Sequence, residues 1–428
     1  MIVTLAQVTV SFAFNASAEE QASAQWAGAA YIMQVGGATS DGTAPLEDLP
    51  IRPSIPWSIA SNTSLPGFSA TCWYTAKEVL TLRAATSPFP DAWAVPLGLV
   101  ASSWGGTPIR AWATPAVWDA CAALYPYPPG EGQTGPSPST PSTLYNAMLA
   151  PLAVGPMRVA GVVWFQGETD TPEVWYNNDW SYPYYSCMLR GLMGGLRAAL
   201  DSAAATWVTV QLAPFLGGAE LPFFRDMQCR VTRAQPLAAC AVIDDDGDPL
   251  SPIGSVHSRN KQLVGRRTAP ALVAALYGPP TLQARGPHYA AATLGQADPS
   301  GAWVYANVSL APGQPGAPLA LAWVPPHINA WQNSSRCPTE IGNVTASDCA
   351  WFNVLGSDGR FYNATQVALA GGGVLLAAPV VPPVPGIVAR GTRFGWGQFP
   401  VVNVYDEGGF PLEPWAANFS GEEATIGE

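Results

Sequence analysis

The sequence predicts an α/β fold, with a three-layer α/β/α domain followed by a smaller antiparallel β domain. Between about residues 55 and 280, apolar strand-like runs alternate with helix-like segments, as in an open, doubly wound sheet. From about residue 281 onward the helical periodicity disappears, and short β-like runs take its place. We therefore expect domains at 1–280 and 281–428.

Four apolar runs define the strands of the first domain. Each run is continuous rather than alternating, which is typical of parallel strands buried on both faces. Between them, apolar residues recur at helical spacing from Leu189 to Leu200 and predict a helix whose apolar face packs into the core. In such sheets ligands bind beyond the carboxyl ends of the strands. The four runs are 95–104, 159–166, 205–215 and 237–246.

The second domain is predicted from runs of a different kind. They are short, and Gly, Pro and Asn residues separate them, a pattern typical of antiparallel strands joined by turns. They lie around 302–310, 318–324, 349–355, 373–381 and 387–405.

Composition excludes several classes of function. The chain has 428 residues and a net charge of −11, so a phosphate backbone would be repelled and no nucleic-acid partner is expected. The sequence has no uninterrupted run of about 18 apolar residues, so no membrane-spanning helix is expected. The aspartates of 244–248 could suggest calcium, but their spacing does not match an EF-hand loop, and the cysteines form no zinc pattern. We expect neither metal nor cofactor.

Two features indicate the secretory pathway, with a glycoprotein that is secreted or lysosomal. The chain has seven Asn-x-Ser/Thr sequons. It also has seven cysteines, of which Cys229/Cys240 and Cys337/Cys349 are close enough in sequence to form disulfides; buried free thiols are the alternative. The apolar stretch 1–20 lacks the basic residues of a typical signal peptide. The sequons are at Asn15, Asn62, Asn307, Asn333, Asn343, Asn363 and Asn418.

The histidines limit the choice of a general base to three residues, His257, His288 and His327. His257 follows a predicted strand and an aspartate-rich loop, where Asp248 could orient the imidazole as the acid of a catalytic triad. A surface turn rich in aspartate would give the same local pattern.

Two interpretations of the segment after the first apolar run are open. Residues 101–105 fit a relaxed nucleophile elbow, in which Ser103 would attack the substrate in the order Ser103, Asp248, His257. In the other interpretation, residues 102–107 donate backbone N–H groups to an oxyanion and the nucleophile lies elsewhere.

Five longer segments carry a resemblance to a known family. They follow one another in the family's order between about residues 55 and 418. On these segments the chain resembles the sialate O-acetylesterase family of the SGNH-hydrolase superfamily. The resemblance implies removal of O-acetyl esters from sialic acids or related glycans through a serine and a histidine, without a metal. The segments are 95–112, 142–152, 162–170, 244–267 and 394–415.

The resemblance also implies individual roles. His257 matches the family's catalytic histidine, and Gly105 and Gly106 match the loop that supplies oxyanion N–H groups. Gln166 is implied near the oxyanion, and Glu168 and Asn146 near the substrate. Trp104, beside the glycines, is the candidate for stacking on a sugar ring.

The sequence departs from the family in three respects. The GQSN motif that holds the nucleophile is absent, and counting back places it at Ile2–Leu5, with Thr4 in the position of the serine. The family's preceding β domain is absent too. We therefore expect a chain that starts too late and a sheet that lacks its first strand, with unpaired neighbours. Third, the superfamily often has an aspartate three residues before the catalytic histidine, but Gly254 occupies that position here. The acid of the triad would then be Asp248 or Asp245.

Three functions remain open at this point. The first is an esterase whose extended form includes the serine, and the second is a non-catalytic glycan-binding protein that uses the same pocket. The third is an α/β-hydrolase-type esterase that uses Ser103.

Overall fold

The computed structural model forms two compact units, which are described here one at a time. The first comprises residues 1–212, 223–243 and 257–284, and the second comprises 213–222, 244–256 and 285–428. The residues described are 1–6, 8–41, 43–86, 95–126, 137–153, 158–171, 181–215, 221–277, 282–314, 316–323, 352–370, 372–400, 402 and 404–419.

A seven-stranded sheet forms the centre of the first unit, in the order β3-β2-β4-β1-β5-β6-β7. All neighbouring strands are parallel except β3, which runs antiparallel to β2 at one edge. The four predicted apolar runs form β4 to β7, so the predicted α/β class is confirmed. The strands are β1 (Ile2–Leu5), β2 (Ala30–Gln34), β3 (Ile55–Ile59), β4 (Leu97–Ala101), β5 (Gly161–Trp164), β6 (Thr206–Val210) and β7 (Ala238–Ala241).

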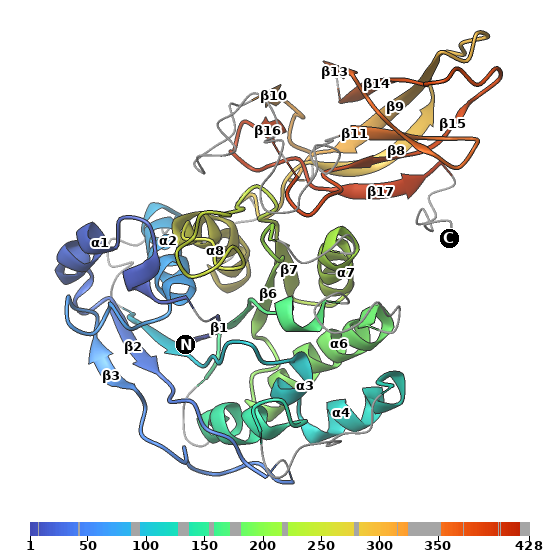
Figure 1. Cartoon of the computed structure of the whole chain (residues 1–428). Helices are drawn as coiled ribbons and strands as arrows, with labels where there is room; N and C mark the ends of the chain where they lie inside the picture. Colours follow the sequence, from blue (N-terminus) through green and yellow to red (C-terminus); the bar gives the residue numbers. More distant parts are fainter. Residues whose placement is uncertain are drawn as a thin grey trace. The chain divides into compact units, whose positions relative to one another are not determined.

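Helices cover both faces of this sheet (Figure 1). On one face lie α1 (Ala16–Ala22), α2 (Ala70–Thr86) and α8 (Lys261–Tyr277). On the other lie α3 (Ile109–Trp112), α4 (Pro115–Cys121), α6 (Ser181–Ala199) and α7 (Leu221–Arg233). The apolar positions predicted between Leu189 and Leu200 are all buried, so the predicted core face of α6 is confirmed. No helix in the described part of the chain is both long and apolar enough to cross a membrane.

The central position in the sheet belongs to β1. Ile2 is in register with Leu99 of β4 and with Gly161 of β5, so both edges of β1 are paired. The prediction that the sheet lacks its first strand is therefore wrong. Residues 2–5 were matched to the nucleophile motif, but this short segment with three β-branched residues suits a fully buried strand, and all four residues are buried.

The second unit is built from antiparallel sheets, as predicted for this half of the chain. One sheet has the order β12-β11-β15-β17 and another β13-β14-β9-β8, while β10 and β16 form a separate pair. The first two share one apolar core that includes Val304, Val374 and Phe394. The strands are β8 (His288–Leu294), β9 (Trp303–Ala311), β10 (Leu321–Trp323), β11 (Phe352–Gly356), β12 (Phe361–Asn363), β13 (Gln366–Ala370), β14 (Gly373–Pro379), β15 (Ala389–Phe394), β16 (Val404–Asp406) and β17 (Trp415–Asn418).

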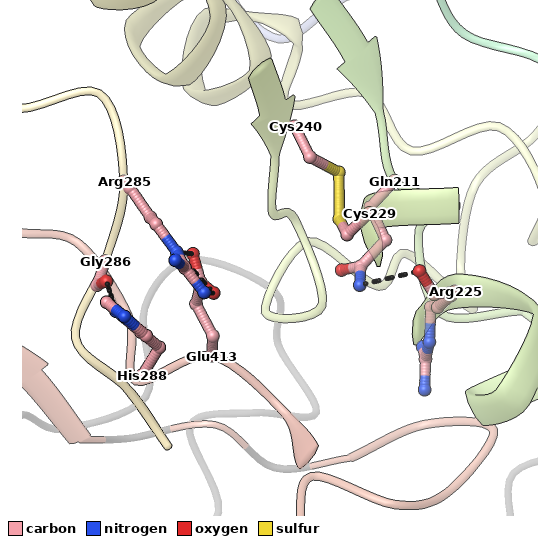
Figure 2. A network of polar contacts seen from close by, with 8 residues as sticks. All are labelled: Gln211, Arg225, Cys229, Cys240, Arg285, Gly286, His288 and Glu413. Carbon is pink, nitrogen blue, oxygen red and sulfur yellow. Dashed lines mark hydrogen bonds and ion pairs between the residues drawn. A yellow bond between two sulfur atoms is a disulfide. The ribbon is translucent and has the colours of Figure 1, made fainter. Parts of the chain in front are cut away.

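An ion pair joins two distant segments of the second unit (Figure 2). Arg285 donates from Nε to both carboxylate oxygens of Glu413, at 3.1 and 3.0 Å, and from Nη2 to Oε2 at 2.9 Å. The carboxylate is almost fully buried, so this two-pronged pairing offsets the cost of removing its charge from water. Gly286 follows at once, and a Cβ there would lie 2.1 Å from the Pro411 carbonyl oxygen.

Two disulfides lie in the first unit. Cys229 is bonded to Cys240, as predicted, and Figure 2 shows this bond between α7 and β7. Cys121 is bonded to Cys187 across 66 residues, a pairing that sequence proximity could not indicate. Cys72 is a buried free thiol. The predicted partners Cys337 and Cys349 lie outside the described residues.

The two disulfides should differ in what they contribute to stability. Replacing both cysteines of the Cys121–Cys187 pair with serine should lower the free energy of unfolding by about 4 kcal/mol, because this bond closes the longer loop. The corresponding change at Cys229–Cys240, across 11 residues, should cost about 3 kcal/mol. Urea unfolding of the two double variants measures both values; a greater loss from the shorter loop would contradict this loop-length argument.

Candidate functional site

Polar loops follow the strands at the centre of the sheet. β1 lies between β4 and β5. The chain runs from β1 to β2 on one side of it and later crosses from β4 to β5 on the other, so the carboxyl ends of these strands form a topological switch point. Residues 102–107 follow β4, and residues 166–170 follow β5. The predicted site residues Trp104, Gly105 and Gly106 belong to the first loop, and Gln166 and Glu168 to the second.

The loop after β4 is held by hydrogen bonds at both ends. The backbone N–H of Ser102 donates to the Thr4 carbonyl (3.0 Å), and its hydroxyl donates to the Met148 carbonyl (3.1 Å). At the other end, the Thr107 hydroxyl donates to the Trp104 carbonyl at 2.6 Å. Gly106 has φ +69°, a backbone conformation that favours glycine. The loop can therefore present fixed backbone N–H groups to an anion.

Gln166 connects the two loops. Its Nε2 donates to the Thr107 carbonyl (3.0 Å) and to Oδ2 of Asp170 (2.6 Å), while its Oε1 accepts a bond from the Tyr185 hydroxyl (3.1 Å). Both amide hydrogens are thus directed at protein oxygens. An oxyanion contact from Gln166, as the resemblance implies, requires the exchange of one of these bonds for a bond to substrate.

Two carboxyl groups in the second loop have raised pKa values. Burial raises the pKa of Asp170 to about 6, and hydrogen bonds from Gln166 and from the Ile109 N–H partly offset that shift. Burial also raises the pKa of Glu168, which the positive charge of Lys261 partly counteracts. The loop therefore combines polar contacts with removal from water, as binding sites commonly do.

Asn146 is the least satisfied polar side chain near this edge. It lies in a π-helical turn (Tyr145–Leu149) and is fully buried, and among the described residues neither Nδ2 nor Oδ1 has a hydrogen-bond partner. The Met148 carbonyl that accepts from Ser102 belongs to the same turn, so this turn lies against the end of β4. π-Helical turns are frequent at functional sites, and an unpaired buried amide costs stability. Asn146 therefore stays a candidate for a ligand contact.

His257 precedes α8 and is partly buried. Burial lowers its pKa, and the positive charge of Lys261 lowers it further. Lys261 is itself buried at the first residue of α8, with Nζ 4.8 Å from the centre of the Phe165 ring. A lowered pKa favours the neutral imidazole near pH 7, the state that a general base requires.

The effect of Lys261 on His257 can be measured directly. Replacing Lys261 with methionine should raise the pKa of His257 toward its ordinary value of about 6.5, because a neighbouring positive charge is lost. The ring-proton NMR shifts of His257 against pH report the change, and Lys261→Arg, which keeps the charge, is the control. An unchanged or lower pKa in Lys261→Met would contradict this electrostatic account.

The predicted triad acid lies in the other unit. Asp248 is buried in segment 244–256 of the second unit, whereas His257 begins a segment of the first, so their pairing stays a prediction. Asp245, the alternative acid, accepts a hydrogen bond from the Tyr405 hydroxyl at 2.8 Å. In the described residues, no group of three or more His, Cys, Asp or Glu side chains is arranged to hold a metal ion.

The two candidate nucleophiles, Thr4 and Ser103, differ in how deeply they are buried. Thr4 is fully buried within β1, which is paired on both sides. Ser103 is partly buried in the loop that carries Gly105 and Gly106. Trp104 packs against the backbone of Gly37, where a Cβ would lie 3.0 Å from the indole ring.

Sequence reasoning missed Asp170 and Lys261. Each acts through a neighbour, Asp170 by its bond with Gln166 and Lys261 by its charge near His257. A weak signal existed for Lys261, because the chain has only two lysines and one of them follows the histidine motif.

Comparison with known proteins shows which family part of the chain is similar to. Residues 77–273 match the model of a carbohydrate esterase family described as sialic acid-specific acetylesterase. The resemblance to the sialate O-acetylesterase family is confirmed.

Curated relatives give the same result over a longer stretch. The chain is 31% identical to the sialate O-acetylesterases of Homo sapiens and Pongo abelii over 306 residues, which is 66% of this chain and 53% of theirs. The chain spans about half the length of the curated relatives it matches. A crystal structure of a carbohydrate acetylesterase from Xanthomonas citri has the same fold, with a TM-score of 0.69, 24% identity and coverage of 97% of this chain and 79% of that one.

Proposed function

We propose that the protein is a carbohydrate O-acetylesterase that hydrolyses acetyl esters on sialic acids or related glycans in the secretory pathway, as a secreted or lysosomal enzyme. The observation that carries this proposal is the buried, unpaired amide of Asn146 at the carboxyl edge of the sheet. An amide N–H held without a protein partner is ready to donate to an oxygen that develops negative charge.

The proposed mechanism uses groups from three segments. Neutral His257 accepts the proton of the attacking hydroxyl, and the imidazolium then donates it to the leaving sugar oxygen. The N–H groups of Gly105 and Gly106, with Nδ2 of Asn146, bind the oxyanion of the tetrahedral intermediate. Water hydrolyses the acetyl-enzyme and releases acetate. Asp248 orients the imidazole in this proposal.

Substrate contacts come from the loop residues beside these groups. Trp104 provides an aromatic surface for the apolar face of a sugar ring, and Glu168 provides a carboxylate for its hydroxyls. The hydroxyls of Ser102 and Thr107, on either side of this loop, donate to backbone carbonyls. Ser103, two residues before Gly105, is therefore the nucleophile to test first.

A second function has its own supporting observation. Neither serine nor cysteine occurs directly after β1, where Ala6, Val8 and Thr9 follow, although the family's nucleophile lies after the first strand. A protein without that nucleophile would bind the acetylated glycan and release no acetate.

One experiment separates these functions. Acetate release from an O-acetylated sialic acid is measured for the chain and for Ser103→Ala and His257→Ala, with sugar binding followed by calorimetry. Release that both variants abolish supports the esterase with Ser103 as nucleophile, and release that survives Ser103→Ala excludes Ser103. Binding without release supports the glycan-binding function, and neither binding nor release would overturn both proposals.

A further inference from the structure

The outer face of the sheet β13-β14-β9-β8 has two aromatic side chains beside a glycosylation sequon. Along β9, Val304 and Val308 belong to the core of the second unit. Because side chains alternate along a strand, Trp303, Tyr305 and Asn307 point to the opposite face. The rings of Trp303 and Tyr305 have centroids 6.4 Å apart and planes tilted by 30°, so they form a nearly continuous aromatic surface that leads to Asn307.

The surroundings of Asn307 leave its side chain accessible. Asn307 is exposed and is in register with Leu375, which is 47% exposed, and with Thr293 on the other neighbouring strand. Its Nδ2 donates to the Leu294 carbonyl at 3.3 Å. That nitrogen has two hydrogens, so substitution of one leaves the other for this bond.

We propose that Asn307 is N-glycosylated and that the first sugar of the glycan packs on the surface formed by Tyr305 and Trp303. The donor is an oligosaccharide linked to a lipid pyrophosphate. Nδ2 attacks C1 of its first sugar, the C1–O bond to the pyrophosphate breaks, and the lipid pyrophosphate leaves. A base of the transferase takes the Nδ2 proton. The packed sugar also covers Leu375, an apolar side chain otherwise in water.

This inference does not depend on the esterase activity, but it does rest on the proposed secretory location. The two disulfides of the first unit support that location, because such bonds persist in oxidising compartments. The sequon follows Tyr305 by two residues on the same strand face, which places a ring and a glycan attachment point side by side.

Other exposed sequons lack this arrangement. Asn363 follows Phe361 by two residues, but the Arg393 guanidinium lies 3.9 Å from the centre of the Phe361 ring and occupies it. Asn62 is exposed, and the residue two positions before it is the buried Ala60. Asn62 is therefore the matched control, a sequon without an aromatic neighbour at that position.

The test uses the full chain, secreted from a glycosylating eukaryotic cell behind a secretory leader. Glycopeptide mass spectrometry gives the occupancy of each sequon, and an endoglycosidase then trims the glycans to one sugar. We expect Asn307 to be occupied. Asn307→Gln should lower the melting temperature of the trimmed protein by about 2–4 °C, whereas Asn62→Gln should leave it unchanged.

The contribution of the rings is tested in the Tyr305→Ala background. There Asn307→Gln should no longer change the melting temperature, because the packing partner of the sugar is lost. An unoccupied Asn307 in the secreted protein overturns the proposal. An occupied Asn307 whose loss changes the melting temperature equally in both backgrounds overturns the packing.

Discussion

Replacing His257 with alanine will lower kcat/KM for acetate release by about 10⁴-fold or more, the effect seen when other hydrolases lose a residue of the catalytic triad. The fold should be unaffected, because His257 is partly buried in a loop between strand and helix and not in the core. Acetate release gives the rate, and the melting temperature reports the fold.

The chain offers a matched control for this change. His288 is also partly buried, and its ring contacts the Gly286 carbonyl at 3.3 Å in the second unit, outside the proposed machinery. His288→Ala should leave kcat/KM within about twofold of the wild type, since no catalytic role depends on it. Equal losses in both variants would remove His257 from the mechanism.

Replacing Asn146 with leucine should lower kcat by about 10²–10³-fold, the effect of removing one oxyanion donor. Stability should be unchanged or higher, because the buried amide makes no hydrogen bond that leucine would lose. An unpaired buried polar group costs about 1–3 kcal/mol, and leucine has the same branched arrangement of side-chain heavy atoms. Asn146→Leu should therefore lower kcat, while its melting temperature stays the same or rises.

Asn353 is the control for this prediction. It is equally buried, but its Nδ2 donates to Asn363 (2.6 Å) and its Oδ1 accepts from Arg393 (2.7 Å). Asn353→Leu should lower the melting temperature and leave acetate release unchanged. If Asn146→Leu is instead destabilised as much as Asn353→Leu, Asn146 has a structural partner and its proposed role fails.

Sequence patterns located β4 to β7 and several strands of the second unit, but missed those at the start of the chain and β8, β12, β13 and β17. The runs that became β4 to β7 are long and apolar, as burial on both faces requires. β3 is mostly exposed at the sheet edge and includes Pro56, so it lacks that signal. β1 was overlooked because comparison with the family assigned its four residues to a motif.

The site was predicted unevenly for a physical reason. Motifs with unusual residues, such as the histidine at 257 and the glycines at 105 and 106, stand out along the chain. The unpaired amide of Asn146 and the bonds of Gln166 exist only in the folded protein, because their partners come from other segments. Sequence alone therefore indicated which residues matter and left their contacts unknown.

The central place of β1 has a consequence for how the protein folds. Its partners begin at Leu99 and Gly161, so the sheet cannot close around β1 until more than one third of the chain has been synthesised. Pairings of such long sequence separation slow folding. Until then the segment Ile2–Leu5 is an unpaired apolar strand on the nascent chain, and we expect it to be a site that chaperones protect from aggregation.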